Sequence, residues 1–91
     1  MKIKIYGLQC QETERVIFNV QSAVMGREDA PIICWINDIE KMKLWIGIIP
    51  VLLFDDTMKS CGYVPSTEEI KEWLKEEQHT NEKLSEEIPL L

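Results

Sequence analysis

The chain begins with an alternation of apolar and polar side chains. Ile3 and Ile5 would face one side of an extended segment, and the lysines and the tyrosine around them would face the other. This period of two residues is typical of a strand with one buried face. We therefore predict a strand over residues 2–6 and a short loop over residues 7–9.

After the loop the apolar positions follow a helical period. They recur at spacings of three and four residues from about residue 11 to residue 25, and Gly26 then ends the run. Such a stripe predicts an amphipathic helix that packs its apolar face on a sheet. The stripe consists of Val16, Ile17, Val20, Ala23 and Val24.

A short apolar run and a short helix follow. The run IICWI, residues 32–36, is rich in isoleucine and follows Pro31, so we predict a second strand there. Asn37 or Asp38 then begins a short helix. We expect its inner face to consist of Ile39, Met42 and Ile46.

The run PVLLF, residues 50–54, is apolar at every position. A continuous run of this length predicts a central strand that is buried on both faces. The residues DDT make a turn, and residues 58–61 return as the partner of a hairpin. Ser66 and Glu69 have the spacing of a capping box, which predicts the start of a last helix. Its buried stripe would be Ile70, Trp73 and Leu74.

These elements predict an α/β fold in a single domain. The order is strand, helix, strand, helix, strand, strand, helix, and a strand joined to the next through a helix should be parallel to it. The result is a four-stranded mixed sheet flanked by helices. We place the domain at residues 1–77 and a polar C-terminal extension, either a frayed helix or a mobile tail, at residues 78–91.

Charge and hydropathy exclude several classes of protein. The formal net charge of −6 and the scattered lysines argue against a nucleic-acid-binding protein. No apolar run approaches the roughly 20 residues that cross a membrane. The start MKIKIYG does not look like a signal peptide. We therefore expect a cytoplasmic protein that does not bind membranes.

Cys10 is the first candidate for chemistry. It lies at the predicted start of the first helix, where unpaired N–H groups and the helix dipole favour a thiolate. Glu12 and Glu14 place two negative charges in the first turn, and these oppose a thiolate. From these local features Cys10 is either a reactive thiol or an inert small residue at a turn.

We expect structural roles for the other residues that could carry chemistry. The three cysteines, Cys10, Cys34 and Cys61, are too widely spaced for a zinc knuckle, and we expect no metal or organic cofactor. Cys34 lies in an apolar strand and fits a core position. The three tryptophans fit core or half-buried positions, because no basic groove accompanies them.

The segments MKIKIYG, IPVLLF and CGYVPSTEEIKEWLKE, taken with the order of the elements, resemble the small thioredoxin-like proteins. The compact glutaredoxin-like thioredoxins are the most similar subgroup, and the resemblance covers about residues 1–77. It implies the strand order 2-1-3-4 and a nucleophile at Cys10. It also implies a cis bond between Ile49 and Pro50 facing that nucleophile, with Gly62 beside the same site.

One departure from the family pattern is informative. The second cysteine of the Cys-x-x-Cys motif is replaced by Thr13, so this motif lacks its resolving thiol. Cys10 then works alone as in monothiol glutaredoxins, or Cys61 replaces the lost thiol, or the fold survives as a redox-inactive module that binds proteins or peptides. The acidic segment of glutathione-binding relatives is missing, since CGYVPS stands after the fourth strand.

We expect a thiol–disulfide protein of thioredoxin or glutaredoxin type with a single motif cysteine, the alternative being the binding module. Cys10 would be the nucleophile, Thr13 would donate a hydrogen bond to its sulfur, and Pro50 would shape a substrate groove. The expected partners are protein thiols and disulfides or an extended peptide, with glutathione as a co-substrate, and the expected state is a monomer or a weak homodimer. The groove would be lined by Ile49, Gly62 and Tyr63.

Overall fold

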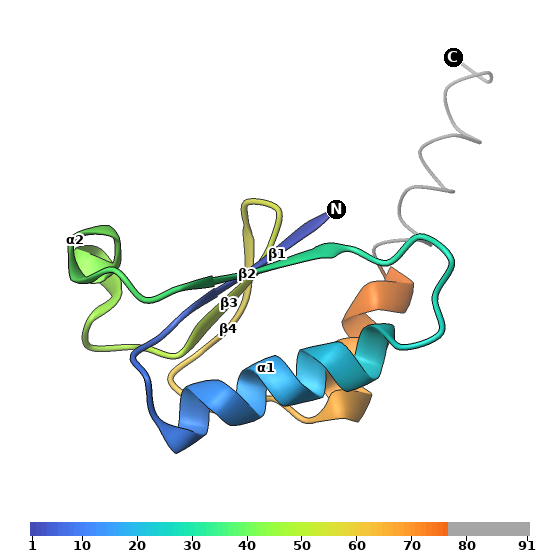
Figure 1. Cartoon of the computed structure of the whole chain (residues 1–91), viewed down its shortest axis with the longest axis horizontal. Coiled ribbons are helices and arrows are strands. Elements are labelled where there is room, and N and C mark those ends of the chain that lie inside the picture. Colours follow the sequence, from blue (N-terminus) through green and yellow to red (C-terminus); the bar gives the residue numbers. More distant parts are fainter. Residues whose placement is uncertain (77–91) are drawn as a thin grey trace, which may run out of the picture.

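The computed structural model describes residues 1–76 and has the elements that the sequence predicts. Figure 1 shows how the strands and helices of the described chain are arranged. The elements are β1 (Lys2–Tyr6), α1 (Gln11–Val24), β2 (Ile32–Ile36), α2 (Ile39–Met42), the 3-10 turn η1 (Lys43–Trp45), β3 (Val51–Phe54) and β4 (Thr57–Cys61). Residues 67–76 form the last described helix. The expected extension over residues 78–91 lies outside the described residues.

The four strands form one mixed sheet in the order β2-β1-β3-β4. β1 and β2 are parallel, whereas β3 is antiparallel to both β1 and β4. All four residues of β3 are buried, as the continuous apolar run predicted for a central strand. The predicted α/β fold with a four-stranded mixed sheet in the strand order 2-1-3-4 is confirmed.

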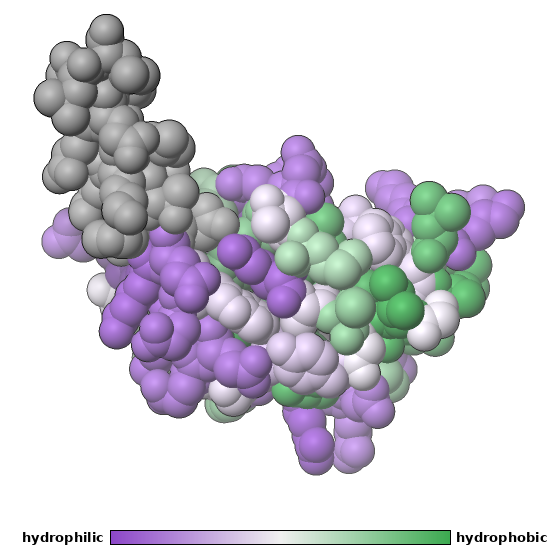
Figure 2. Space-filling view, turned by 180° about the vertical axis from the view of Figure 1, so that it is seen from behind, coloured by the Kyte–Doolittle hydropathy of each residue, from purple (hydrophilic) through white to green (hydrophobic). Residues whose placement is uncertain are grey.

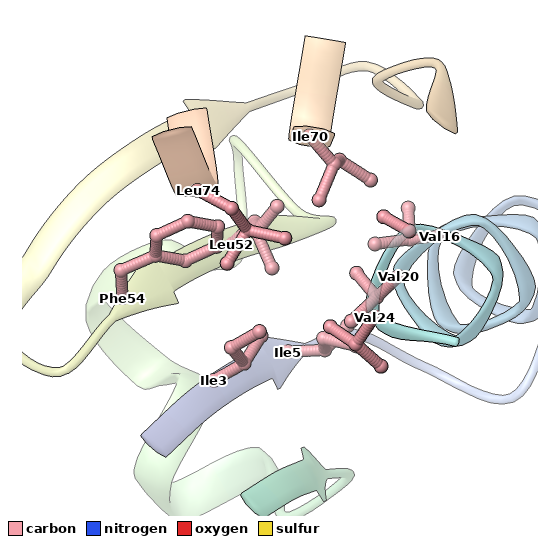
Figure 3. Packing of buried hydrophobic residues seen from close by; sticks show 10 residues of the cluster. Ile3, Ile5, Val16, Val20, Val24, Leu52, Phe54, Ile70 and Leu74 are labelled. Carbon is pink, nitrogen blue, oxygen red and sulfur yellow. The ribbon is translucent and has the colours of Figure 1, made fainter. Parts of the chain in front are cut away.

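The main core lies between one face of the sheet and two helices. Ile3 and Ile5 of β1 share this face with their register partners Phe54 and Leu52 of β3. Helix α1 supplies the predicted apolar stripe, and the helix of residues 67–76 supplies Ile70 and Leu74 (Figure 3). Burying each of these aliphatic side chains contributes about 1.5–3 kcal/mol of transfer free energy.

The other face of the sheet has a smaller cover. Helix α2 lies across the strands from α1 (Figure 1) and is only four residues long. Of its expected inner face, Met42 is fully buried, but Ile39 is 62% exposed and Ile46 is 55% exposed. The expectation for these two residues is wrong because the helix changes to a 3-10 turn after Met42, and one helical turn buries only one such position.

Local sequence signals set the helix starts. Asp38 caps α2, and its side chain accepts a hydrogen bond from the Glu40 N–H at 3.0 Å. The predicted capping box is present: the Glu69 N–H donates to the Ser66 hydroxyl at 3.1 Å, and the Ser66 N–H donates to the Glu69 carboxylate at 3.3 Å. Among residues 1–76, no helix is both long and apolar enough to cross a membrane.

The register brings three chain segments to one end of the sheet. Tyr6, the last residue of β1, pairs with Val51, the first residue of β3. Val51 also pairs with Cys61, the last residue of β4. The loop after β1, the segment before β3 and the turn after β4 therefore lie next to one another, and these segments hold the candidate site residues.

Candidate functional site

Cys10 is the N-cap residue of α1. Its backbone is extended, with φ −154° and ψ 170°, and its carbonyl accepts the first helical hydrogen bond from the Glu14 N–H at 3.0 Å. The Cys10 residue is exposed. The sulfur therefore sits at the end of a helix where the unpaired N–H groups are, and solvent can reach it.

Thr13 provides polar groups near this sulfur. The Cys10 Sγ atom lies 3.5 Å from the Thr13 Oγ1 atom. Hydrogen bonds from the Thr13 backbone N–H, and then from its side chain, lower the pKa of Cys10. The Glu12 backbone N–H adds to this, whereas partial desolvation and the charge of Glu12 act in the opposite direction. The balance favours the thiolate, as expected for a cysteine at a helix start.

Gly7 helps to hold the Thr13 side chain near the Cys10 sulfur. The Thr13 side chain is 1% exposed and packs against the backbone of Gly7. A Cβ atom at Gly7 would overlap Thr13 Oγ1 and lie 2.9 Å from Thr13 Cγ2, closer than real Cβ atoms approach their neighbours. Only glycine therefore fits between β1 and α1 when the threonine occupies this position. Sequence reasoning missed this role, although a glycine between a strand and a helix is a recognisable signal for a close approach.

The segment before β3 contains the cis bond that the resemblance implies. The bond between Ile49 and Pro50 is cis, and Pro50 is buried. The Pro50 carbonyl accepts a hydrogen bond from the Gly62 N–H at 3.0 Å, and Gly62 has a φ of 76°, which favours glycine. Pro50 thus has its carbonyl engaged and has no N–H to donate. The N–H and C=O of Ile49, by contrast, take part in no hydrogen bond within residues 1–76.

Cys61 lies at the same end of the sheet but points to the other face. It pairs with Val51, whereas its neighbour Ser60 pairs with Leu52 of the core. Helix α1, which begins after Cys10, covers the core face. Both cysteines are free thiols and both are exposed. The register therefore counts against Cys61 as the resolving partner of Cys10, because the residue of β4 on the core face here is Ser60.

Tyr63 follows Gly62 and is bound to the start of the last helix. Its hydroxyl donates to the Glu69 carboxylate at 3.1 Å, the same carboxylate that accepts from the Ser66 N–H. Partial desolvation, and then the hydrogen bond to Glu69, raise the pKa of Tyr63. The tyrosine is therefore protonated at physiological pH, and its hydrogen bond joins the turn after β4 to the last helix.

The remaining candidates have structural positions. Cys34 is half-buried, and Trp45 packs against Tyr6 with ring centroids 6.1 Å apart. Trp35 differs from the expectation, because it is 40% exposed and its indole N–H donates to the Gly7 carbonyl at 2.9 Å. Within residues 1–76 no group of three or more histidine, cysteine or acidic side chains could hold a metal ion.

Comparison with known proteins agrees with this geometry. The model of the family described as thioredoxin domain matches residues 1–75. A thioredoxin of Methanocaldococcus jannaschii is 34% identical over 73 residues, which cover 80% of this chain and 85% of that protein. No solved structure gives a significant match. The fold, the cysteine at the start of the first helix and the match over most of the chain lead to one assignment: the chain belongs to the thioredoxin family.

Proposed function

We propose that this thioredoxin-like protein exchanges disulfides through Cys10 as its single motif cysteine. The observation that carries the proposal is the exposed Cys10 sulfur at the start of α1, 3.5 Å from the Thr13 hydroxyl. Hydrogen bonds from Thr13 lower the pKa of this thiol and increase the fraction of thiolate at neutral pH. The thiolate is the nucleophile in thiol–disulfide exchange.

The first step would form a mixed disulfide. The Cys10 thiolate attacks one sulfur of a substrate disulfide, and a bond forms between that sulfur and Sγ while the substrate bond breaks. The other substrate sulfur leaves as a thiolate and takes a proton from solvent. As the thiolate of Cys10 attacks, the Thr13 hydroxyl would donate to it, since a thiolate has no proton to give.

The second step would use an external thiol. A small thiol such as glutathione, as a thiolate, attacks the outer sulfur of the mixed disulfide, and Cys10 leaves as the thiolate. The substrate disulfide is thus exchanged for a disulfide that includes the external thiol, which supplies the electrons. Thr13 cannot perform this attack, and Cys61 points away from α1. Such a cycle fits a reducing compartment such as the cytoplasm.

The substrate would be a protein or peptide in extended form. The N–H and C=O of Ile49, with no hydrogen bond within the described chain, can pair with an extended peptide next to the site. The segment before Ile49 is apolar and exposed, with Ile46 at 55% and Ile48 at 38%. Figure 2 shows hydrophobic residues gathered at the end of the molecule where Figure 1 places α2. An apolar side chain of the peptide would be covered there.

The experiment uses a short apolar peptide whose cysteine carries glutathione. Reduced protein is mixed with the peptide, and the adducts on each cysteine are measured by mass spectrometry over time. We expect a mixed disulfide on Cys10 that added glutathione removes. Cys10→Ser should abolish the transfer, and the matched variant Cys34→Ser should keep it. Binding of the peptide without any transfer would refute the exchange activity and establish the alternative, a redox-inactive binding module, which the negative charge of Glu12 beside Cys10 favours.

A further inference from the structure

Trp35 makes a hydrogen bond that links the edge of the sheet to the loop before Cys10. It lies on β2, the edge strand, and its indole N–H donates to the Gly7 carbonyl at 2.9 Å. The Gly7 N–H donates to the Ile36 carbonyl at 3.2 Å. Both polar groups of the Gly7 backbone are thus held by β2, one by a side chain and one by the main chain.

A glycine at this position needs such restraint. Without a Cβ atom, Gly7 can adopt more backbone conformations than any other residue, and its neighbours must select one. The selected conformation decides where the chain enters the Cys10 loop. It also decides how the Gly7 backbone packs on Thr13, whose hydroxyl lies 3.5 Å from the Cys10 sulfur.

We propose that Trp35 is a positioning residue for Cys10, acting through Gly7 and Thr13. The indole N–H fixes the Gly7 carbonyl, the fixed Gly7 backbone supports Thr13, and Thr13 presents its N–H and hydroxyl to the sulfur. Trp35, on an edge strand, therefore affects the reactivity of the Cys10 thiol. The inference deepens the proposed function and takes its purpose from it, but the effect on the thiol can be measured without any disulfide exchange.

The test compares the pH profile of Cys10 alkylation in three proteins. Trp35→Phe keeps an aromatic ring and removes the N–H. Trp73→Phe is the matched control, since Trp73 is a partly buried residue packed on the core. Alkylation of the Cys10 peptide by a small haloacetamide is followed by mass spectrometry, so that the other cysteines do not interfere. Thermal unfolding of each variant verifies that it is folded.

The expected result is a profile for Trp35→Phe that moves to higher pH, while the plateau rate at high pH is kept. Below the midpoint we expect alkylation about threefold slower, because each unit of rise in a thiol pKa removes about tenfold of the thiolate. The profile of Trp73→Phe should coincide with that of the unmodified protein. Coincidence of all three profiles, or an equal shift in both variants, would overturn the proposal.

A second measurement uses the unmodified protein and so does not depend on how Trp35→Phe folds. The indole N–H signals of the tryptophans are followed by NMR while Cys10 is titrated and then alkylated. We expect the Trp35 signal to move with the Cys10 titration and to exchange slowly with solvent, and the Trp73 signal to stay unchanged. A Trp35 signal that exchanges as fast as that of a free indole and ignores Cys10 would overturn the inference.

These outcomes are separate from those of the proposed function. If Cys10 transfers no disulfide but the Trp35→Phe profile still moves, the positioning role stands and the exchange activity fails. If disulfides are exchanged but the profiles coincide, the exchange activity stands and the role of Trp35 fails.

Discussion

The Cys10 Sγ atom and the Thr13 Oγ1 atom lie 3.5 Å apart, and the threonine is almost fully buried while the cysteine is exposed. An exposed sulfur thus has a buried hydroxyl beside it. The two residues are three positions apart across a helix start, so the chain itself brings them together. The resemblance to thioredoxin-like proteins implies a second thiol at the position of this hydroxyl.

Replacing Thr13 by valine tests the support that the hydroxyl gives. Thr13→Val keeps the branched shape and the backbone N–H but removes the hydroxyl, one of the groups that lower the pKa of Cys10. The pKa should rise, so the pH profile of thiol alkylation moves to higher pH. Below the midpoint we expect a rate about threefold to tenfold lower, because the rate follows the thiolate fraction. Thr57→Val, at the exposed first residue of β4, is the control and should leave the profile unchanged. A profile of Thr13→Val that does not move would show that the backbone N–H acts alone.

Replacing Thr13 by cysteine tests whether the site still supports a dithiol cycle. Thr13→Cys places a thiol where Oγ1 lies, 3.5 Å from the Cys10 sulfur, which is close enough to form a disulfide after a small side-chain movement. Reduction of insulin by dithiothreitol should become about tenfold faster or more, since an intramolecular attack replaces a bimolecular step. The double variant Cys10→Ser, Thr13→Cys should lose the gain. A Thr13→Cys protein that forms the internal disulfide but reduces no insulin would indicate that the surface around Pro50 does not accept disulfide substrates.

A side chain at Gly7 should lower the free energy of unfolding. The Cβ of Gly7→Ala would overlap the buried Thr13 side chain, so either the loop or the threonine must move. We expect a loss of about 1–3 kcal/mol in the free energy of unfolding, the usual cost of overpacking. Urea denaturation measures it. Gly47→Ala is the matched control because a Cβ atom added there would meet nothing within 4 Å, and its effect should stay within about 0.5 kcal/mol. Equal effects of the two substitutions would contradict the close packing of Gly7 on Thr13.

The capping box links the turn after β4 to the last helix. Ser66→Ala removes the acceptor of the Glu69 N–H, and we expect a loss of about 1 kcal/mol in the free energy of unfolding. The exposed neighbour Glu68 lies in the same first turn and makes no capping bond within residues 1–76, so Glu68→Ala serves as the control in the same urea series. A Ser66→Ala protein as stable as the control would mean that the helix start does not depend on this cap.

The elements and the main core could be read from hydrophobic spacing. The period of two residues identified β1, and the stripe from Val16 to Val24 identified the buried face of α1. The same reading failed at Ile39 and Ile46, which are exposed. A periodic pattern states which residues would share a face of a helix, but it does not state how long the helix is or whether another element covers that face.

Part of the candidate site could likewise be predicted from the sequence. Cys10 and Thr13 stand three residues apart at a helix start, and a local spacing of this kind fixes a local contact. The face of the sheet on which Cys61 lies could not be predicted from the sequence. It depends on the register between β3 and β4, and that pairing contains an irregularity between Leu52 and Leu53. One residue of shift in a strand moves a side chain to the opposite face.

The sequence by itself determined the order of strands and helices, the buried stripes and the local surroundings of Cys10, because each of these depends on residues close along the chain. Only the tertiary structure decided that Cys61 faces away from α1 and that the Trp35 indole holds the Gly7 carbonyl. Those relationships join residues that are far apart in sequence, and they depend on strand register and on the approach of one backbone to another, which no local pattern specifies.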